Sequence, residues 1–401
     1  ELRYLNISAG RANLYQAMAS QILYNRPPSD WKREMIRRNR KGRSTLWTYG
    51  ISGDLPIVLL RVSRMEHMEL VQQMLTAHEY MRLKGLQVDL VLLNEYGNSY
   101  EQPVNERLRE LAGISHARDL MDKPGGVFLR QSSNIPKEDL CLLFCASRLI
   151  LNGEDGSISS QLLLNKKSNE TIPLLNTQDI DYHVVSKNEI PRPAGLAYFN
   201  DMGGFSEDGK EYVVYLKDRK VTPLPWSNII SNPEFGFLVT ESGSGYTWCG
   251  NSRENKLTPW SNDPIRDPSG EILYVRDDKT GEYWTITPMP VREAESYRIR
   301  HGQGYTVFEH ASHGMMMQQT MLVPLKDPVK IIGVSLKNNT DRPRKLSLFF
   351  YVEWVLGVNR EESGPFILTE FDGETNSMQA YNYYQEEFAG RTAFLSCNRD
   401  I

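Results

Sequence analysis

Two hydrophobic patterns divide the sequence near residue 190. Before it, short continuous apolar runs alternate with segments in which apolar residues recur every three or four positions. After it, apolar and polar residues alternate one by one, among frequent glycines, prolines and aromatic residues. The first pattern is typical of buried parallel strands that alternate with helices, and the second of half-buried antiparallel strands. The sequence therefore predicts an α/β region followed by a β region.

Continuous apolar runs predict the strands of the first region, at residues 55–62, 88–93 and 126–130. Helical spacing predicts helices at 12–23, 63–85, 103–112 and 134–149. We expect Ser63 to cap the second of these helices and Gly85 to end it. The alternation of strands and helices predicts a small parallel sheet.

Parallel sheets of this kind bind ligands beyond the carboxyl ends of their strands. The polar residues expected at that edge are Ser63, Asn94, Glu95 and residues 131–134. However, neither GxGxxG nor GxxxxGK followed by serine or threonine occurs after any of the three predicted strands. A packing or docking role is therefore favoured, and an enzyme that acts on a nucleotide or phosphorylated ligand remains an alternative.

Alternation in steps of two predicts strands in the second region, at residues 209–216, 329–336 and 345–354. A polar turn at 338–343 separates the last two, so we expect them to pair as an antiparallel hairpin. About a dozen candidate strands follow residue 195. Because this is too many for one flat sheet, the sequence predicts two stacked antiparallel sheets.

Two prolines, Pro191 and Pro193, favour extended backbone between the regions. We therefore predict a linker at 187–195, an α/β domain with leading helices at 1–186 and a β-sandwich at 196–401. The predicted fold class is α+β multidomain, with a small parallel sheet in the first domain and a large antiparallel sandwich in the second.

Residues 232–290 combine strand-like aromatic segments with polar loops. Aromatic faces stack on the C–H groups of sugar rings, and planar polar side chains bond to the rim of hydroxyls. The candidates for carbohydrate contact or interdomain packing are therefore Trp248, Asn251, Arg253, Trp260, Asn262 and Asp263. A simpler interpretation also stays open, in which the aromatic residues form the sandwich core and the polar groups satisfy one another in turns.

Composition and charge exclude some function classes. With 40% hydrophobic residues and a net charge of -4, nothing in the composition favours nucleic acid or an anionic membrane as partner. No apolar run approaches the roughly 20 residues of a membrane-spanning helix, and the N-terminus lacks a signal-peptide pattern. The four cysteines are scattered, and Cys141 and Cys145 have the helical spacing of buried thiols. A reducing, cytoplasmic location is expected.

No complete catalytic set is recognisable. His310 and His313 form the only close histidine pair, but a strand would place them on opposite faces, and no cysteine or carboxylate triplet accompanies them. No GxSxG elbow precedes a helix. A carboxylate pair for glycosidic cleavage could be drawn from Asp263, Asp267, Asp277, Asp278 or Glu282, but turn formation explains these residues equally well. The sequence therefore predicts neither catalytic residues nor a metal site in this chain.

Several motifs of the second region resemble the N-terminal β-sandwich of glycoside hydrolase family 94. They are residues 232–236, 242–248, 251–255, 257–264, 274–277, Trp284, 301–305 and 351–357, so the resemblance covers about residues 195 to 401. This family contains the inverting phosphorylases of cellobiose, chitobiose and β-1,2-glucan. Residues 46–57 resemble the segment that precedes the sandwich in cyclic β-1,2-glucan synthases and 1,2-β-oligoglucan phosphorylases, which implies β-1,2-linked glucose.

The resemblance implies that an (α/α)6 barrel follows the sandwich and carries the general-acid aspartate and the residues that hold phosphate. Because this sequence stops at Ile401, before any such barrel, we expect a non-catalytic fragment and carry over no catalytic residue. The implied parent is a bacterial glycosyltransferase or phosphorylase that cleaves β-1,2-glucosidic bonds with inorganic phosphate as co-substrate and no other cofactor. A free-standing carbohydrate-binding module without turnover is the alternative.

The resemblance also implies partners and a location. The expected partners are a β-1,2-linked glucose oligosaccharide, the helical catalytic domain and a second copy in a homodimer, without nucleic acid and without a membrane segment in this chain. The expected location is the cytoplasm, or the cytoplasmic part of a membrane-bound synthase.

Overall fold

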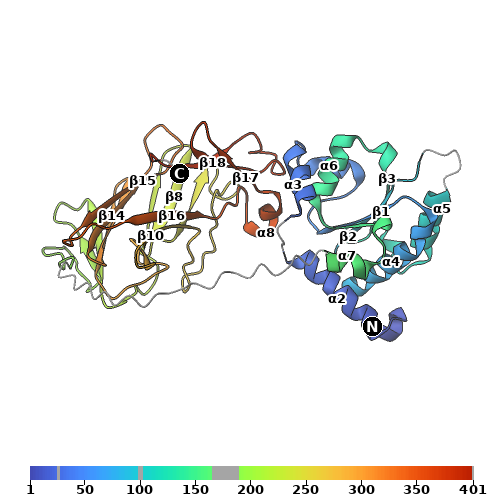
Figure 1. Cartoon of the computed structure of the whole chain (residues 1–401), viewed down its shortest axis with the longest axis horizontal. Helices are drawn as coiled ribbons and strands as arrows, with labels where there is room; N and C mark the ends of the chain where they lie inside the picture. The colour runs from blue at the N-terminus through green and yellow to red at the C-terminus, as the bar shows by residue number, and fades with distance from the viewer. Residues whose placement is uncertain (25–27, 98–102, 165–188, 400–401) are drawn as a thin grey trace. The chain divides into compact units, whose positions relative to one another are not determined.

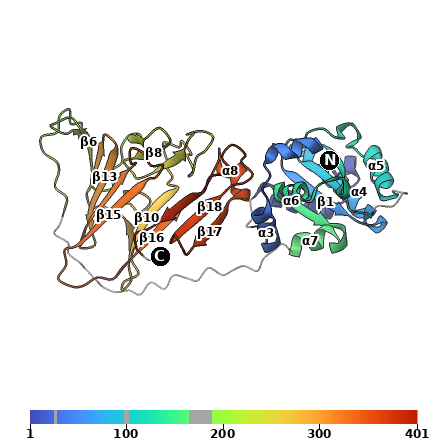
Figure 2. The same cartoon turned by 90° about the horizontal axis from the view of Figure 1, so that it is seen from above.

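The computed structural model describes residues 1–24, 28–97, 103–164 and 189–399. Contacts divide the chain into two compact units, Glu1–Ile172 with Gly364–Ile401, and Pro173–Ser363. The first contains a parallel sheet with helices and the second several antiparallel sheets (Figure 1 and Figure 2). The predicted fold class is therefore confirmed, and we call these parts the α/β unit and the β unit.

The boundaries of these units differ from the predicted domains. The predicted linker at 187–195 lies partly outside the described residues, because 187 and 188 are not described; residues 189–195 contain no helix or strand. The contacts assign residues 364–401 to the α/β unit, although the sequence pattern placed them in the second domain.

A four-stranded sheet in the order β3–β2–β1–β4 forms the centre of the α/β unit. All neighbouring strands are parallel. The three predicted strands are present as β1 (Ile57–Val62), β2 (Asp89–Asn94) and β3 (Val127–Gln131). The sequence pattern missed β4 (Ser147–Asn152), which occupies the end of the predicted helix 134–149. No glycine or proline separates that helix from the strand, so the apolar run continues across the boundary.

Alternate residues of the central strands point to opposite faces of this sheet, which explains why the predicted strands are apolar throughout. One face packs on α2 (Ala9–Leu23), α4 (Met68–Leu83), α5 (Pro103–Ile114) and α7 (Ile158–Leu164). The other face packs on α6 (Lys137–Ala146) and the 3-10 helix η1 (Arg43–Tyr49). The remaining helices are α1 (Leu2–Leu5), α3 (Asp30–Arg38), η2 (Met65–His67), η3 (Arg118–Leu120), η4 (Ser132–Asn134), η5 (Gly153–Asp155) and η6 (Gly364–Phe366).

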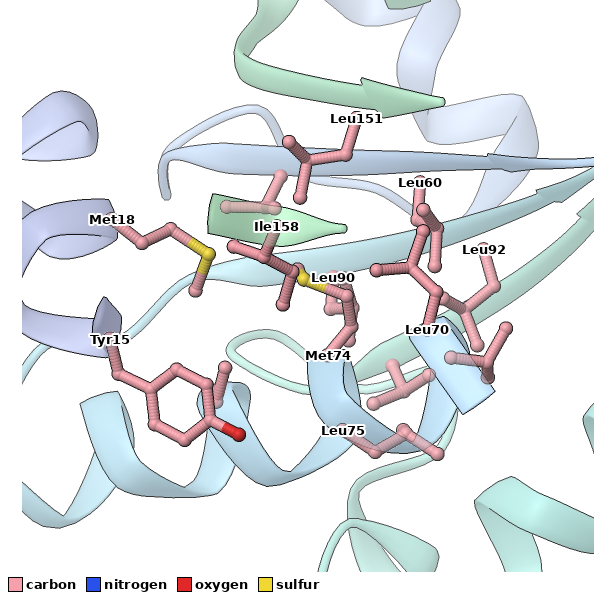
Figure 3. Packing of buried hydrophobic residues seen from close by; sticks show 14 of the residues in the cluster. Tyr15, Met18, Leu60, Leu70, Met74, Leu75, Leu90, Leu92, Leu151 and Ile158 are labelled. Carbon is pink, nitrogen blue, oxygen red and sulfur yellow. The ribbon is translucent and has the colours of Figure 1, made fainter. Parts of the chain in front are cut away.

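The first face carries the larger core cluster of the α/β unit (Figure 3). Met18 from α2 and Met74 from α4 are fully buried, as is Leu60 of β1. Complete burial of such side chains stabilises a fold by roughly 1.5–3 kcal/mol each. Apolar burial on both faces of the sheet therefore holds this unit together.

The helix that follows β1 begins differently from the prediction. Ser63 does not cap it; instead its hydroxyl donates to a Glu154 carboxylate oxygen at 2.6 Å. Helix α4 begins at Met68, after the short helix η2. Gly85 follows the helix end with a φ of +84°, a left-handed conformation that favours glycine, as predicted.

A C-terminal segment completes the α/β unit with three antiparallel strands, β17 (Leu368–Asp372), β18 (Ser377–Tyr381) and β19 (Ala393–Ser396). Phe366 stacks on Tyr384 with ring centroids 3.8 Å apart. A Glu386 carboxylate oxygen accepts the Ser44 N–H at 2.6 Å. A Cβ on Gly42 would lie 1.9 Å from Cγ of Glu386. Glycine at position 42 therefore leaves room for this long-range contact.

The β unit contains three antiparallel sheets, in the orders β15–β14–β13–β12–β6–β5, β11–β10–β16 and β7–β8–β9. Their inward faces share one core, in which Phe237, Trp284 and Phe308 are fully buried. The elements are β5 (Gly203–Phe205), β6 (Glu211–Leu216), β7 (Ser227–Ser231), β8 (Phe235–Thr240), β9 (Gly245–Cys249), β10 (Glu271–Asp277), β11 (Tyr283–Thr285), β12 (Tyr297–Gly302), β13 (Tyr305–Ser312), β14 (Met315–Leu322), β15 (Ile331–Asn338), β16 (Leu346–Val352) and α8 (Arg360–Ser363).

The predicted hairpin between residues 329–336 and 345–354 is wrong. Strand β15 pairs with β14, whereas β16 pairs with β10 in another sheet. Between them, Arg344 donates to an Asp277 carboxylate oxygen at the end of β10, with an Nε–Oδ2 distance of 2.6 Å. Alternation identifies a strand and its buried face but does not identify its partner, which depends on contacts such as this ion pair.

Among the described residues, no helix combines the length and the apolar character that crossing a bilayer requires.

Candidate functional site

Three aromatic side chains of the β unit lie together, Tyr246 and Trp248 from β9 and Trp260 from a following loop, and we call them the aromatic cluster. The ring centroids of Tyr246 and Trp248 are 5.2 Å apart, and those of Tyr246 and Trp260 are 5.3 Å apart. All three side chains are half-buried, so parts of their rings face solvent. The structure thus brings together two predicted tryptophans and adds Tyr246, which the two-residue spacing to Trp248 on one strand could have identified.

The position of Trp248 depends on a glycine in the neighbouring strand. Gly236 of β8 lies opposite Trp248 in the antiparallel register. A Cβ on Gly236 would lie 2.5 Å from Cζ2 of the indole. The indole therefore packs directly over the Gly236 backbone, and any larger residue there would displace the ring.

A buried carboxylate behind the aromatic cluster ties its two supporting segments together. Glu271 accepts hydrogen bonds from the hydroxyls of Thr247 at 2.5 Å and Thr258 at 2.7 Å. Its other oxygen pairs with Lys330 Nζ at 2.7 Å. Burial alone would raise the pKa of Glu271, but Lys330 and the two hydroxyls lower it overall. Because Thr247 lies next to the cluster on β9 and Thr258 precedes Trp260, this network holds both segments in place.

Two of the predicted polar residues close turns in the loops beside the cluster. The side-chain oxygen of Asn251 accepts the backbone N–H groups of Arg253 and Glu254, each at 2.9 Å. Asp263 accepts the N–H groups of residues 265 and 266, each at 3.0 Å. These backbone bonds lower the pKa of Asp263. Both oxygens therefore stabilise the loops.

The other two polar candidates are exposed to solvent. The side chain of Arg253 is 84% exposed and pairs with Glu254 at an Nε–Oε1 distance of 3.2 Å. Asn262 is exposed and has a φ of +50°, a conformation that asparagine tolerates better than most residues. These side chains can reach a ligand in solution, and a contact with carbohydrate stays a prediction for all six candidates.

Two further carboxylates near this stretch support loops. Asp267 accepts hydrogen bonds from the hydroxyls of Thr240, at 2.7 Å, and Ser242. Glu241 accepts the backbone N–H of Trp226 at 2.7 Å, and burial raises its pKa. Because these contacts are local and structural, neither carboxylate has the arrangement of a general acid poised over an open cleft.

The side chains at the predicted ligand edge of the parallel sheet bond to neighbouring side chains or to the nearby backbone. The two carboxylate oxygens of Glu95 share the Nε–H of Arg61, at 3.0 and 3.1 Å. The Asn94 oxygen accepts the backbone N–H of Tyr96 at 2.9 Å, and Ser63 donates to Glu154 as described above. These contacts give the edge a structural role and add nothing in favour of a nucleotide site.

Residues 210–401 match the model described as "Glycosyl hydrolase 94, supersandwich domain". The match spans the β unit from residue 210 onward and the C-terminal segment that contacts assign to the α/β unit. We call residues 210–401 the supersandwich domain after the family 94 domain that they resemble. The match includes the aromatic cluster and all six predicted residues, and it confirms the resemblance seen in the sequence.

The whole chain is 32% identical, over 416 aligned residues, to the cyclic beta-(1,2)-glucan synthase NdvB of Rhizobium meliloti (strain 1021). It is 30% identical over 155 residues to the N,N'-diacetylchitobiose phosphorylase of Vibrio furnissii. It is 31% identical over 189 residues to the solabiose phosphorylase of Paenibacillus borealis. The two phosphorylase matches cover 38% and 46% of this chain. The chain is therefore similar to a region that carbohydrate-active enzymes share.

This chain spans only a small part of those relatives. It covers 14% of the synthase, 19% of the chitobiose phosphorylase and 24% of the solabiose phosphorylase.

The histidine pair of the supersandwich domain corrects one prediction. His313 lies at the turn after β13 with a φ of +50°, so it does not follow strand alternation. His310 and His313 both contact the carboxylate of Glu293, at Nε2–O distances of 2.7 and 2.6 Å. Trp284 stacks on His313 and Tyr297 stacks on His310. Within the described ranges, no group of three or more histidine, cysteine, aspartate or glutamate residues is arranged to hold a metal ion.

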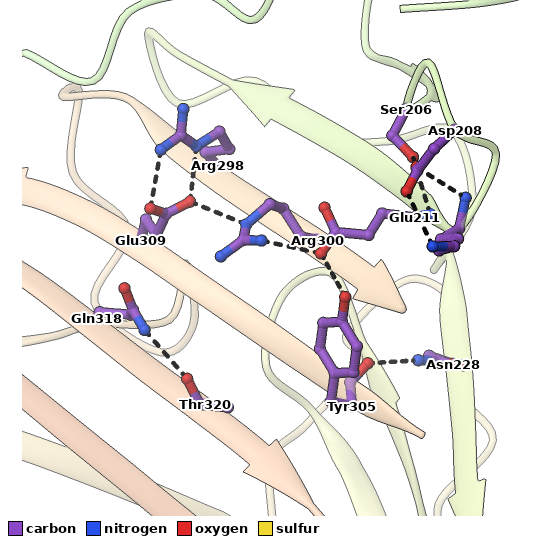
Figure 4. A network of polar contacts seen from close by, with 11 residues as sticks. Ser206, Asp208, Glu211, Asn228, Arg298, Arg300, Tyr305, Glu309, Gln318 and Thr320 are labelled. Carbon is purple, nitrogen blue, oxygen red and sulfur yellow. Dashed lines mark hydrogen bonds and ion pairs between the residues drawn. The ribbon is translucent and has the colours of Figure 1, made fainter. Parts of the chain in front are cut away.

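The six-stranded sheet of the supersandwich domain carries a network of charges (Figure 4). Arg298 forms a two-pronged contact with Glu309, at 2.6 and 2.8 Å. Arg300 pairs with Glu309 at 3.3 Å and with Glu211 at 2.8 Å, and the Tyr305 hydroxyl donates to Glu211 at 2.6 Å. The charges neutralise one another across three neighbouring strands. The network therefore supports the pairing of the strands and leaves no charge directed at a ligand.

Proposed function

We propose that this chain is part of an enzyme that cleaves β-1,2-linked glucan by inverting phosphorolysis. In this proposal the supersandwich domain contributes its aromatic cluster to the rim of the sugar cleft. The observation that carries the proposal is the extent of similarity: the match to a cyclic beta-(1,2)-glucan synthase covers 100% of the chain, α/β unit included. Similarity to two phosphorylases, over 38% and 46% of the chain, supports phosphorolysis as the reaction type.

In the proposed reaction, an oxygen of inorganic phosphate attacks the anomeric carbon while the bond to the glycosidic oxygen breaks. A carboxylic acid donates its proton to the leaving oxygen, and the products are α-glucose 1-phosphate and a shortened glucan. Phosphate is the co-substrate and no other cofactor is proposed. We assign the acid and the phosphate-binding groups to a helical catalytic domain outside this chain, because Glu271, Asp263 and Asp267 already have structural partners.

The chemistry of the aromatic cluster supports its proposed role. Its rings are half-buried and inclined to one another by 31–39°, so they offer faces to a sugar ring. Arg253 and Asn262 extend from the adjoining loops and supply hydrogen-bond donors for hydroxyl groups. Homodimer contacts and a cytoplasmic setting, alone or as part of a membrane-bound synthase, remain proposals that follow from the family.

Calorimetry with the full chain tests the role of the cluster. Linear β-1,2-glucan oligosaccharides are expected to bind, and Trp260→Ala is expected to weaken binding about tenfold or more because it removes a stacking face. Trp47→Ala is the matched control, since Trp47 is a 61% exposed tryptophan of the other unit, and it should leave the affinity unchanged. Equal binding of β-1,4-linked oligosaccharides, or no binding at all, would contradict the proposal.

The reaction itself is tested with the full-length parent enzyme. Incubation with β-1,2-linked glucose oligomers and phosphate is expected to release α-glucose 1-phosphate, and omission of phosphate should abolish the product. A free-standing carbohydrate-binding module is the second candidate, favoured by the structural engagement of Glu271, Asp263 and Asp267. Glucan binding by a parent that never forms glucose 1-phosphate would favour this second candidate.

A further inference from the structure

A second aromatic surface lies on the outward face of the sheet β11–β10–β16. We call it the outer aromatic face, and its residues are Tyr274, Tyr283, Phe349 and Tyr351. Tyr283, Phe349 and Tyr351 are 53%, 50% and 47% exposed, and Tyr274 is half-buried among them. Tyr274 lies opposite Phe349 in the register of β10 and β16, and its ring centroid is 6.2 Å from that of Tyr283. Three strands thus contribute to one continuous surface.

Folding of the sheet does not require this surface. The opposite face of β10 and β11 supplies the core, where Val275 and Trp284 are fully buried. On the same side of β16, Leu346 packs against this core and Leu348 is 49% exposed. The outward face of an antiparallel sheet is usually polar, as it is in the arginine and glutamate network of Figure 4. Single exposed apolar residues are normal on a protein surface, whereas a contiguous apolar patch of a few hundred Å² is often a functional one.

The chemistry of the outer aromatic face suits a carbohydrate. Three of its four residues are tyrosines, which combine a flat apolar ring with a hydroxyl that can bond to a sugar. Arg276 lies opposite Tyr283 in the register and is exposed. In the described part of the chain, the Arg276 guanidinium has neither a hydrogen-bond nor an ion-pair partner. It can therefore donate hydrogen bonds to the hydroxyls of a neutral ligand.

We infer that the outer aromatic face binds a stretch of β-glucan chain, as a second sugar-binding surface in addition to the aromatic cluster. The choice of glucan as ligand rests on the proposed function. Residues 349 and 351 are two positions apart on one strand, and residues 274 and 283 continue the surface across two more. The face therefore extends over roughly 15–20 Å, enough for several consecutive sugar rings.

The size of the face argues against a second protein copy as its occupant. A large aromatic side chain buries about 150–250 Å² when it is fully covered. Three half-exposed rings therefore offer roughly 250–400 Å², about half or less of the ~800 Å² that each partner buries in a standard protein interface. A sugar chain, by contrast, needs only the faces of a few rings.

The inference is tested by removing the rings while the surface stays apolar. In the full chain, the double variant Phe349→Leu with Tyr351→Leu is expected to weaken the second class of glucan sites about tenfold or more in calorimetry. Phe349→Tyr keeps a ring and should keep the binding. The control is Ile331→Ala with Val334→Ala on β15, a strand of the six-stranded sheet, where these side chains are 46% and 36% exposed. That control should bind like the unmodified chain.

The outcomes separate this inference from the proposed function. Two sites per chain are expected, of which the leucine variant loses one and Trp260→Ala the other. If the leucine variant keeps both sites, or if Trp260→Ala alone removes all binding, the inference is wrong while the proposed function stands. If the unmodified chain binds no β-1,2-glucan, both are wrong. Self-association in analytical ultracentrifugation that disappears in the leucine variant would also overturn the inference, because a second copy would then occupy the face.

Discussion

The two units of this chain hold their interiors together in different ways. Leucine, valine, isoleucine and methionine dominate the core clusters of the α/β unit, and one carboxylate oxygen of its buried Asp89 has no hydrogen-bond partner. In the same unit the buried Glu79 pairs with Arg82, whose side chain is 41% exposed. In the β unit both members of an ion pair are largely buried, as in Arg344 with Asp277 and Lys330 with Glu271. A parallel sheet covered on both faces leaves little space for polar groups, whereas the sandwich must anchor long loops between its sheets. We therefore expect the α/β unit to lose most stability when a buried apolar side chain is removed. We expect the β unit to lose most stability when one member of a buried ion pair is removed.

The largest expected loss of stability follows from breaking a buried ion pair of the β unit. Arg344→Ala should destabilise it by about 3–5 kcal/mol, because it leaves the carboxylate of Asp277 buried without its cation. The side chains of Arg344 and Asp277 are only 6% and 3% exposed. Denaturant unfolding followed by hydrogen exchange should locate the loss in the β unit. Lys345→Ala, an exposed neighbour, is the control and should change little.

The corresponding defect in the α/β unit is a cavity. Met74 is fully buried against the parallel sheet, so Met74→Ala should destabilise that unit by about 2–5 kcal/mol. Hydrogen exchange should become faster in β1 and β2 and stay unchanged in the β unit. Met65→Ala serves as the control because Met65 is 44% exposed. Equal losses from both substitutions would show that this core does not depend on tight packing.

A smaller effect is expected where Glu293 joins two histidines. Burial alone would raise the pKa of Glu293, but His310 and His313 lower it; burial alone would lower the pKa of His313, but Glu293 raises it. The contribution of Glu293 is lost as pH falls through its lowered pKa, and that of His313 as pH rises through its raised pKa. The contact should therefore stabilise most between about pH 4.5 and 6.5.

The test of this contact is Glu293→Gln, which should cost about 1.5–3 kcal/mol near pH 6 and less at pH 9, because two charge-assisted hydrogen bonds are lost. Thermal unfolding at a series of pH values measures the difference. Glu295→Gln removes an exposed carboxylate nearby and should retain the pH dependence of the unmodified chain. A pH profile that is the same with and without Glu293 would contradict the assignment.

The smallest expected effect concerns Asp89, a buried carboxylate of the α/β unit. It tests whether a buried charge also limits the stability of the unit that depends mainly on apolar packing. Burial raises the pKa of Asp89 to about 6, so its ionisation costs stability as pH rises from about 4 to 6. Asp89→Asn keeps an oxygen that can accept the Gly125 N–H and cannot ionise. It should therefore stabilise the α/β unit by up to about 1–3 kcal/mol at pH 8 and by little at pH 4, as measured by denaturant unfolding.

Much of this architecture could be predicted from the order of apolar and polar residues. The continuous runs at 55–62 and 88–93 predicted the buried parallel strands β1 and β2, and alternation predicted antiparallel strands in the β unit. The aromatic and polar residues of 232–290, together with the recognisable motifs, predicted the family and two members of the aromatic cluster. These properties are local, because a strand or helix records in its own sequence which of its faces is buried.

Only the tertiary structure decided which segments meet. It paired β16 with β10, joined His310 and His313 through Glu293, placed residues 364–401 in the α/β unit and left Phe349 and Tyr351 exposed on an outer face. Periodicity cannot predict such contacts, because the choice of partner depends on side chains far apart in the sequence and on the free energy of the whole packed unit. The sequence thus determined the elements and their buried faces, and the fold determined the surfaces that are available for binding.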